Sequence, residues 1–415
     1  MLSEDSGKHI LLVSYVFPPY NGIGGRRWAK HADELTRLGY TMHVICAQNP
    51  FRQNSLWTDL VQNNPRIILH QVSAMFPKVL VRFEHSMLEK LMYRFWISIL
   101  PWFTRGSYLD RTMLWKRQMH RKARQIITNY KIKNVICSGG PFGAMYQVTL
   151  LKKWYKDIFI INDMRDPWTW GPNWGFHNIS PKRLSYESMM EGNTVKDSDI
   201  ITVPTLEMKT YLDKKYPVYS SKIKILHHFF DPTEITVEKK TESAKLRLIF
   251  YGTIYHHIPE LIEETARVIA KYRDSITLDI FTDKHQHKST FEKYGADNVT
   301  FHNQLPAMEL FKLFRDFDYV LLTIPGVGVD HISTKFYEII YSKTPFLVFS
   351  KYGLAPKFVV DNQLGVHAGP NELENVFARL VKNKEMANYN TKFDLTGYSL
   401  ADNAKSIESM FKRNA

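Results

Sequence analysis

Two carboxylates and a lysine follow an apolar run in the second half of the chain. Asp330 and Glu338 are eight residues apart, and Lys335 lies between them. Residues 318–326 and 344–350 have the composition of buried parallel strands, which predicts a loop and a short crossover helix between them. Such a loop binds polar or anionic ligands in open α/β sheets, so these side chains predict a site for a ligand with hydroxyls and phosphates. The alternative is that Asp330 lies near a helix N-cap, while Lys335 and Glu338 are ordinary surface charges.

A glycine-rich turn forms a second candidate, between a predicted strand at residues 9–17 and a predicted helix at residues 26–38. Glycines let a backbone approach phosphate oxygens, and the helix N-terminus adds partial positive charge. Arg26 and Arg27 oppose the helix dipole, which favours an anionic ligand over two solvated first-turn residues. A dinucleotide site is disfavoured, because Arg27 replaces the third glycine and residues 47–49 include no acid. The glycines are Gly22, Gly24 and Gly25.

A third candidate follows a predicted strand at residues 157–162. Carboxylates beside tryptophans bind sugars, because carboxylates accept hydrogen bonds from hydroxyls while indole rings stack on the pyranose face. The alternative is a structural ion pair between Arg165 and Asp166. The polar and aromatic residues of this loop are Asp163, Arg165, Asp166, Trp168, Trp170 and Trp174.

The length, the apolar fraction and the cysteine content of the chain limit the kinds of protein that it can be. A chain of 415 residues that is 44% apolar has enough material for two cores. Cys46 and Cys137 lie in apolar runs, which predicts buried thiols in a reducing compartment, with no disulfide scaffold and no zinc site of ordinary spacing. The first residues lack a basic segment and a cleavage site, so we expect a first strand and not a signal peptide.

The positive charge is concentrated in one segment. The chain has a net charge of +14, and residues 78–133 carry 13 lysines and arginines against three carboxylates. Apolar residues at helical spacing run through the same segment, from Phe83 through Met87, Leu91 and Phe95 to Ile99, with Trp96, Trp102, Phe103 and Trp115 nearby. Its most apolar stretch is too short and too charged to span a bilayer. This pattern predicts contact with an anionic membrane surface; the alternative is a helical insertion packed on its own domain. No nucleic-acid module accompanies the charge, so nucleic acid is disfavoured as a partner.

Strand and helix patterns alternate through both halves of the chain. They predict an α/β fold of two doubly wound, Rossmann-like parallel-sheet domains that face an interdomain cleft. We expect an N-terminal domain at residues 1–230 with a helical insertion at 73–130, and a second domain at 231–396. Residues 397–415 form an amphipathic helix that we expect to return to the first domain.

Four segments together resemble a known family. They are HILLVSYVFPPYNGIGGRRWAKHADELTRLGY, CSGGPFGAMYQVTLLKKW followed by NDMRDPWTW, ILHHFFDP, and DHISTKFYEIIYSKTPFLVF. In this order they resemble the GT-B retaining glycosyltransferases of family 4, especially bacterial members that build surface polysaccharides. The resemblance implies a hexosyltransferase that uses a nucleotide-sugar donor and a saccharide or lipid-linked acceptor. It also implies no cofactor or metal, and a cytoplasmic protein on the inner face of the cell membrane.

The resemblance assigns roles to the candidates. Asp330 and Glu338 are similar to the family's E-x7-E motif, so Glu338 would bind the donor ribose and Asp330 would lie near the transferred sugar. The glycine turn with Arg26 would approach the diphosphate. Arg165 and Asp166 would lie at the reacting centre or the acceptor. The residue types of the third candidate predict that Asp163, Trp168 and Trp170 bind the acceptor.

One segment departs from the family pattern. The family usually places an arginine and a lysine after the first strand of its second domain, where this chain has FYGTIYHHIPE. Gly252, Thr253 and His256 would then bind the donor together with Lys335, and His257 lies beside them. The histidines are equally compatible with an exposed loop.

Two other functions are compatible with the sequence. A sugar-binding or scaffold protein of the same fold would explain the missing arginine and lysine. A nucleotide-sugar epimerase shares the two-domain form and would act on the donor without any acceptor.

Overall fold

The computed structural model divides the chain into two compact units. The first comprises Met1–His227 and Leu400–Ala415, and the second comprises His228–Ser399. The structure describes residues 8–48, 55–80, 86–104, 111–170, 180–235, 243–252, 254, 259–282, 285, 287–324, 332, 335–382 and 389–412. The first unit ends at His227, three residues before the predicted end of the first domain. Phe230 lies in the second unit, where it pairs with Ser399 and packs in the core.

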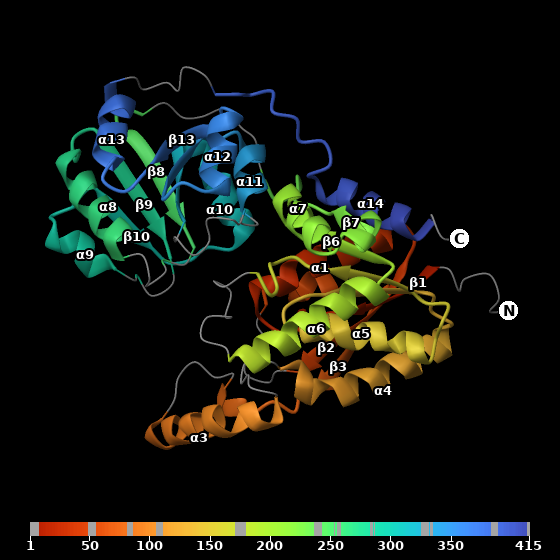
Figure 1. Ribbon diagram of the computed structural model, residues 1–415. Coiled ribbons are helices and arrows are strands. Elements are labelled where there is room, and N and C mark those ends of the chain that lie inside the picture. Colours follow the sequence, from red (N-terminus) through yellow and green to blue (C-terminus); the bar gives the residue numbers. More distant parts are fainter. Residues whose placement is uncertain are drawn as a thin grey trace. The chain divides into compact units, whose positions relative to one another are not determined.

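The first unit contains a seven-stranded parallel sheet (Figure 1). Its strand order is β3-β2-β1-β4-β5-β6-β7. The strands are β1 His9–Val13, β2 Thr41–Gln48, β3 Ile67–Ser73, β4 Asn134–Ser138, β5 Phe159–Asp163, β6 Ile200–Val203 and β7 Ile223–Ile225. Its helices are α1 Ile23–Arg37, α2 Thr58–Gln62, α3 Met87–Phe103, α4 Thr112–Tyr130, α5 Gly143–Thr149, α6 Pro181–Asp197, α7 Leu206–Lys215 and α14 Leu400–Lys412, with short 3-10 turns at Lys78–Leu80, Leu150–Lys153 and Pro217–Lys222.

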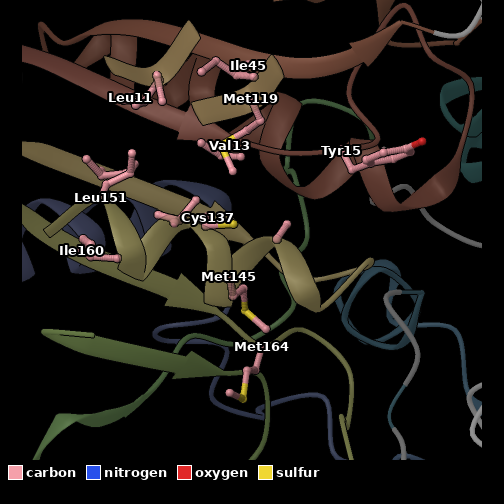
Figure 2. Close-up of a cluster of buried hydrophobic side chains, with 14 of the residues drawn as sticks. Leu11, Val13, Tyr15, Ile45, Met119, Cys137, Met145, Leu151, Ile160 and Met164 are labelled. Carbon is pink, nitrogen blue, oxygen red and sulfur yellow. The ribbon is translucent and has the colours of Figure 1, made fainter. Parts of the chain in front are cut away.

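The alternation of side chains along β1 assigns each face of this sheet to a set of helices. Leu11 and Val13 point to one face, in one core with apolar side chains of α4, α5, α6 and α7. Figure 2 shows Met119 of α4 and Met145 of α5 in this core. Ile10 and Leu12 point to the other face, where they pack with α1 and α14. Both faces are therefore covered, as a run of consecutive apolar residues in a parallel strand requires.

The C-terminal helix α14 belongs to the first unit although its sequence follows the second. Its Phe411 ring lies 6.4 Å from the Tyr40 ring and 6.1 Å from the Phe159 ring. Asn403 also donates a hydrogen bond to the carbonyl of His227 at 3.1 Å. These contacts attach the end of the chain to the last residue of the first unit before the boundary.

The second unit contains a six-stranded parallel sheet with the order β10-β9-β8-β11-β12-β13. Apolar residues of β8 alternate in the same way, with Leu248 facing α8 and α13 and Ile249 facing α10, α11 and α12. The strands are β8 Leu246–Tyr251, β9 Ile276–Phe281, β10 Val299–His302, β11 Tyr319–Ile324, β12 Phe346–Ser350 and β13 Gly365–Ala368. The helices are α8 Pro259–Lys271, α9 Lys288–Lys293, α10 Ala307–Leu313, α11 Phe336–Ser342, α12 Leu354–Asp361 and α13 Leu373–Lys382, with a 3-10 turn at Phe314–Asp316.

The predicted fold class is confirmed in its main features, since both sheets are parallel and flanked by helices. The predicted burial of the two cysteines is also confirmed, because both are free and buried. Burial raises the pKa of the Cys46 thiol to about 12, so this group stays protonated at neutral pH. Both cysteines are packing residues of the first core.

Helix α3 differs from the other helices of the first unit, because most of its apolar residues are exposed. Met87 is 81% exposed, Trp102 is 86% exposed, and Leu100 is the residue of α3 that is buried. The alternative of an insertion with its apolar side packed on its own domain is therefore wrong for α3. Trp115, by contrast, is fully buried in the first core and takes no part in this exposed face. In the described part of the chain, no helix has both the length and the apolar character to cross a membrane.

Candidate functional site

Each sheet has a topological switch point, where the connections that leave two neighbouring strands lead to opposite sides of the sheet. In the second unit this point lies between β8 and β11, since β8 leads to β9 on one side and β11 leads to β12 on the other. Ligands of doubly wound folds bind outside the carboxyl ends of the strands at such a point. Gly252 follows β8 directly, and Lys335 and Glu338 follow β11. The strand order thus brings these three predicted residues to one edge of the sheet.

Lys335 connects the two strands at this edge. Its ammonium donates a hydrogen bond to the carbonyl of Tyr251 at 2.9 Å and lies 4.5 Å from the centre of the Tyr251 ring. Burial lowers the pKa of Lys335 to about 8, and the negative charge of Glu338 partly offsets this effect. At pH 7 the side chain is therefore mostly protonated and partly shielded from water, which strengthens its attraction for an anion.

Gly252 has the backbone conformation that keeps Lys335 in place. Its φ is +106°, and a Cβ atom there would lie 2.1 Å from the Lys335 ammonium nitrogen. A side chain at this position would therefore both strain the backbone and displace the lysine. The glycine after β8 provides the space that the cation occupies.

Glu338 lies in the first turn of α11 and is only 2% exposed. Burying a carboxylate carries a desolvation cost, and such groups are concentrated at functional sites, which makes Glu338 a candidate ligand-binding group. The alternative of a surface residue is wrong for Glu338, whereas Lys335 is half-buried. Asp330, Thr253, His256 and His257 lie outside the described residues, and their predicted roles stay predictions.

The pKa of Lys335 predicts a pH dependence of anion binding. Above pH 8 the neutral amine attracts a diphosphate less, so we expect affinity to fall about tenfold or more from about pH 8 to 10. Isothermal titration of a nucleoside diphosphate at several pH values measures this fall. The variant Lys335→Arg stays charged throughout and should show a flat profile; a fall of equal size in this variant would contradict the assignment.

The same lysine predicts a rise in stability at alkaline pH. The folded protein loses the Lys335 proton near pH 8, whereas the unfolded chain keeps it to about its ordinary value of 10.5. Because the unfolded chain binds more protons between these values, the contribution of Lys335 to the free energy of unfolding rises with pH over that interval.

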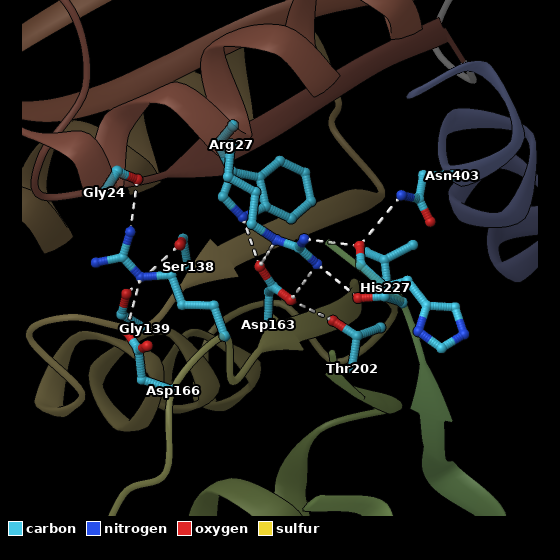
Figure 3. Close-up of polar contacts among 12 residues, drawn as sticks. Gly24, Arg27, Ser138, Gly139, Asp163, Asp166, Thr202, His227 and Asn403 are labelled. Carbon is cyan, nitrogen blue, oxygen red and sulfur yellow. Dashed lines mark hydrogen bonds and ion pairs between the residues drawn. The ribbon is translucent and has the colours of Figure 1, made fainter. Parts of the chain in front are cut away.

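In the first unit the corresponding point lies between β1 and β4. The glycine turn follows β1, and Gly139 and Gly140 follow β4. Arg165, just after β5, connects them: its guanidinium donates a hydrogen bond to the carbonyl of Gly24 at 2.7 Å (Figure 3). A Cβ atom on Gly24 would lie 2.3 Å from this guanidinium, and one on Gly140 would lie 2.6 Å from it. Both glycines are therefore needed for the position of Arg165.

The helix begins earlier than predicted, and this changes the description of the glycine turn. Gly22 is the N-cap of α1, so Gly24 and Gly25 lie inside its first turn. The amide of Gly25 donates to the carbonyl of Gly22 at 2.9 Å. The predicted approach of these glycines to a diphosphate stays a prediction.

Arg27 has an anionic partner within the protein, contrary to the argument that its position indicates a ligand. Its guanidinium contacts the Asp163 carboxylate at 2.9 Å and 3.2 Å, and it also donates to the carbonyls of Leu226 and His227 (Figure 3). Both side chains are almost fully buried, at 4% and 0% exposure. This pair stabilises the fold by joining α1, β5 and the segment after β7.

The predicted acceptor role of Asp163 is wrong. Besides Arg27, its carboxylate accepts hydrogen bonds from Trp28 Nε1 at 2.8 Å and from Thr202 Oγ1 at 2.8 Å. The side chain is 0% exposed, so an acceptor sugar cannot reach it. In the sequence, a carboxylate at the end of a predicted strand looks the same whether it binds a ligand or stabilises the fold. Only its buried partners show that Asp163 has the structural role.

The tryptophans of this loop also differ from the prediction. Trp168 is fully buried and donates to Glu187 at 2.7 Å, so its predicted acceptor role is wrong. Trp170 is partly buried and its ring stacks on Tyr211 at 4.1 Å, so one face is already covered by the protein. The remaining tryptophan of the loop, Trp174, lies outside the described residues.

Three predicted residues have mixed outcomes. Arg165 and Asp166 form the ion pair of the structural alternative at 3.4 Å, and both side chains stay partly exposed, at 17% and 26%. They lie at the edge predicted for the reacting centre, and their catalytic role stays a prediction. Arg26 is 7% exposed and lies 6.0 Å from the ring of Trp57, so the structure gives this guanidinium an aromatic contact and little access to a ligand.

Two contributors to these sites, Tyr251 and Gly140, were not predicted from the sequence. The carbonyl of Tyr251 orients Lys335, but in the sequence Tyr251 is an ordinary aromatic residue at the end of a strand. Gly140 has a φ of +88° and borders Arg165. Gly139 and Gly140 follow the apolar residues of β4, and this pair of glycines could have predicted that another side chain packs closely against the backbone there.

Among the residues that the structure describes, no group of three or more His, Cys, Asp or Glu side chains has the geometry to hold a metal ion. The expected independence from metal and cofactor stays a prediction.

No protein-family model matches the sequence, and neither does any curated protein. Solved structures do match over almost the whole chain. A glycosyltransferase from Rickettsia africae has a TM-score of 0.64 at 12% identity, with 98% of each chain covered. WaaG, a glycosyltransferase involved in lipopolysaccharide biosynthesis, has a TM-score of 0.58 at 12% identity, with 96% of this chain and 95% of WaaG covered.

A third similar structure is an epimerase. The UDP-GlcNAc 2-epimerase from Neisseria meningitidis, bound to UDP-GlcNAc, has a TM-score of 0.57 at 13% identity, with 98% of this chain and all of the epimerase covered. The chain has the GT-B fold. At these identities the likeness shows the fold alone, and the fold is shared by transferases and epimerases.

Proposed function

We propose that this protein is a glycosyltransferase that binds a nucleotide-sugar donor at the Lys335–Glu338 site of the second unit. The observation that supports this most is the position of a buried carboxylate and a partly buried ammonium at the switch point of that sheet. Glu338 would accept hydrogen bonds from the ribose hydroxyls. Lys335 would contact the diphosphate, and Gly252 would let the phosphates approach the backbone.

The chemistry of such a reaction suits this arrangement. Departure of a nucleoside diphosphate leaves negative charge, and a fixed cation withdrawn from water stabilises that charge strongly. Lys335 supplies this cation, and its hydrogen bond to Tyr251 O holds it at the end of β8. Arg165 and Asp166 would act on the acceptor or the transferred sugar in the first unit. By the resemblance to family 4, the transfer would retain the configuration of the sugar.

The acceptor is proposed to be a saccharide or a lipid-linked saccharide of a cell-surface polysaccharide. The family resemblance supports this class, and WaaG among the similar structures is involved in lipopolysaccharide biosynthesis. Both kinds of acceptor present hydroxyls as nucleophiles. The exposed apolar face of α3 adds support for a lipid-linked acceptor, because such an acceptor is located at a membrane.

Contact with an anionic membrane surface, on the cytoplasmic face, is part of the proposal. The exposed apolar residues of α3 are Met87, Leu88, Leu91, Met92, Phe95, Trp102 and Phe103. Helix α4 adds five lysines and arginines and no carboxylate over its 19 residues. An apolar face beside clustered cations is the combination that binds anionic bilayers.

This membrane contact predicts a specific loss on mutation. The double variant Leu91→Asp/Phe95→Asp should lose most of its binding to vesicles that contain phosphatidylglycerol, measured by flotation. Its melting temperature should change little, because the two side chains are 62% and 55% exposed. Leu206→Asp/Val218→Asp alters two side chains that are 60% and 83% exposed elsewhere in the first unit. Equal vesicle binding by the two double variants would contradict the role of α3.

A transfer assay tests the proposed function. The protein is incubated with a panel of nucleotide sugars and with membrane lipid or oligosaccharide acceptors, and the products are analysed by proton NMR. A new glycosidic bond with the anomeric configuration of the donor supports the retaining transferase. A scaffold protein would bind donor without turnover, and the variant Glu338→Ala controls for contaminating activity.

An epimerase is the second candidate, because a UDP-GlcNAc 2-epimerase bound to its nucleotide sugar has the same fold. This reaction needs no acceptor. The same NMR experiment without acceptor distinguishes the two functions. Inversion at a carbon of the donor sugar supports the epimerase, whereas a donor that stays unchanged alone and is consumed when acceptor is added supports the transferase.

A further inference from the structure

A pocket in the helical layer of the first unit lies apart from the candidate donor and acceptor residues. Its volume is about 330 Å³, within the range of small-molecule sites. It lies among α4, α5 and α6, which are neighbours on one side of the sheet (Figure 1). Its lining residues are Lys116, Arg117, His120, Tyr146, Gln147, Leu150, Tyr186 and Met189.

The charged side chains that line this pocket are basic. Its lining includes Lys116, Arg117 and His120 and no carboxylate. Glu187, the acid next to Tyr186 in the sequence, is 5% exposed and is already bound to Arg183 and Trp168. The cations that line the pocket therefore have no acidic partner in its walls.

His120 is held in one orientation at the pocket wall. Its Nε2 donates a hydrogen bond to the carbonyl of Gln147 at 2.8 Å, which joins α4 to α5. The carbonyl can only accept, so the proton of the neutral ring is on Nε2. Burial, together with the charges of Lys116 and Arg124, lowers the pKa of His120, and the Gln147 hydrogen bond partly offsets this. A bound anion would favour the protonated ring, which donates from both nitrogens.

The remaining walls suit a ligand larger than a bare phosphate. Tyr146 and Tyr186 contribute aromatic rings and hydroxyls, and both are partly buried. Leu150 and Met189 contribute apolar surface. Aromatic rings stack on sugar or polyol carbons, while hydroxyls and the Gln147 side chain exchange hydrogen bonds with polyol oxygens.

We propose that the pocket among α4, α5 and α6 binds a phosphate ester of a polyol or sugar, with Lys116 and Arg117 as the phosphate ligands. The phosphate ester is either the headgroup of a membrane lipid or a soluble metabolite. The cationic outer face of α4 and the exposed apolar face of α3 favour the headgroup. Arg183 of α6 donates a hydrogen bond to the carbonyl of Thr104, the residue that ends α3. This bond connects a helix of the pocket wall to the helix that carries the exposed apolar face.

This site goes beyond the proposed function, because it lies away from the switch points. The candidate catalytic residues follow the carboxyl ends of strands, whereas the pocket residues lie along α4, α5 and α6 and, for Leu150, in the 3-10 turn after α5. Binding at the pocket can therefore be measured without any sugar transfer. Failure of the transferase proposal would leave this test intact.

Binding measurements on the full chain test the site. Glycerol 3-phosphate and glucose 6-phosphate are titrated by calorimetry, and vesicles of phosphatidylcholine with or without phosphatidylglycerol are tested by flotation. We expect Lys116→Ala/Arg117→Ala to weaken binding of the phosphate ester at least tenfold. The control Arg121→Ala/Lys122→Ala removes the same charge from the same helix outside the pocket, and it should change binding less than threefold.

Each outcome decides the proposal. Saturable binding of a soluble ester that only the pocket variant loses supports the site with a soluble ligand. Binding to phosphatidylglycerol vesicles that only the pocket variant loses supports it with a lipid headgroup. Equal losses in both double variants would show diffuse charge without a site and overturn the proposal, as would wild-type protein that binds neither probe. Circular dichroism confirms that both variants are folded.

Discussion

The substitution Asp163→Asn lowers the free energy of unfolding of the first unit by about 3–5 kcal/mol, the cost expected when a buried ion pair loses one charge. Asp163 accepts hydrogen bonds from Arg27, Trp28 and Thr202, and it is 0% exposed. An asparagine has one acceptor oxygen, and its NH2 group cannot accept the hydrogen bonds that Arg27, Trp28 and Thr202 donate to the carboxylate. The Arg27 cation would then remain in the interior without a counter-charge. Urea denaturation of wild type and variant measures the difference.

Asp166→Asn is the matched control for this substitution. It lies three residues away, and its ion pair with Arg165 at 3.4 Å is partly exposed. Partly exposed pairs contribute little, so we expect a loss of about 1 kcal/mol or less. This variant should instead affect transfer, if Asp166 acts on the acceptor. Similar small losses of stability in both variants would contradict the structural role of Asp163.

The second large effect is expected from Gly252→Ala, which removes the space occupied by the Lys335 ammonium. The new Cβ would lie 2.1 Å from that nitrogen, so the hydrogen bond to Tyr251 O breaks. Losing a charge-assisted contact to the donor diphosphate costs about 1.5–3 kcal/mol, which is about 10- to 100-fold in affinity. Isothermal titration with the preferred nucleoside diphosphate measures this loss.

Backbone strain has to be separated from displacement of the lysine. Gly397 also has a positive φ, of +84°, in the same unit, and nothing lies within 4 Å of a Cβ added there. Gly397→Ala therefore introduces a comparable strain of about 1–3 kcal/mol without touching Lys335. It should lower stability and leave nucleotide affinity unchanged. If both alanine variants lose affinity equally, Lys335 is not a donor ligand.

Much of the fold was predictable because both faces of each sheet are covered. Consecutive apolar residues such as Ile10, Leu11 and Leu12 are typical of a strand buried on both sides, and most predicted strands agree with the structure within a few residues. Several elements of the second unit were not predicted, including α9, α12 and α13, although α13 has buried apolar residues at helical spacing. The early start of α1 was not predicted because Gly24 and Gly25 have low helix propensity. In the structure Gly24 lies against Arg165, and Gly25 lies against the backbone of Val16 and Phe17.

The candidate sites were predictable where chain order determines position. Lys335 and Glu338 follow one strand, and topology alone brings them beside Gly252 at the end of the neighbouring strand. Asp163 could not be assigned in this way. Its partner Arg27 is 136 residues away in sequence, and no local pattern shows that the two side chains are buried together.

The most direct test of the account is a thermal-shift panel of nucleoside diphosphates with wild type and Glu338→Ala. A ligand that binds only the folded protein adds about 2.7 kcal/mol at a hundredfold excess over Kd. The account predicts a rise in melting temperature with at least one nucleotide, and the loss of that rise in the variant. A folded wild-type protein that shifts with none of them, or a variant that shifts equally, would contradict a donor site at Lys335 and Glu338.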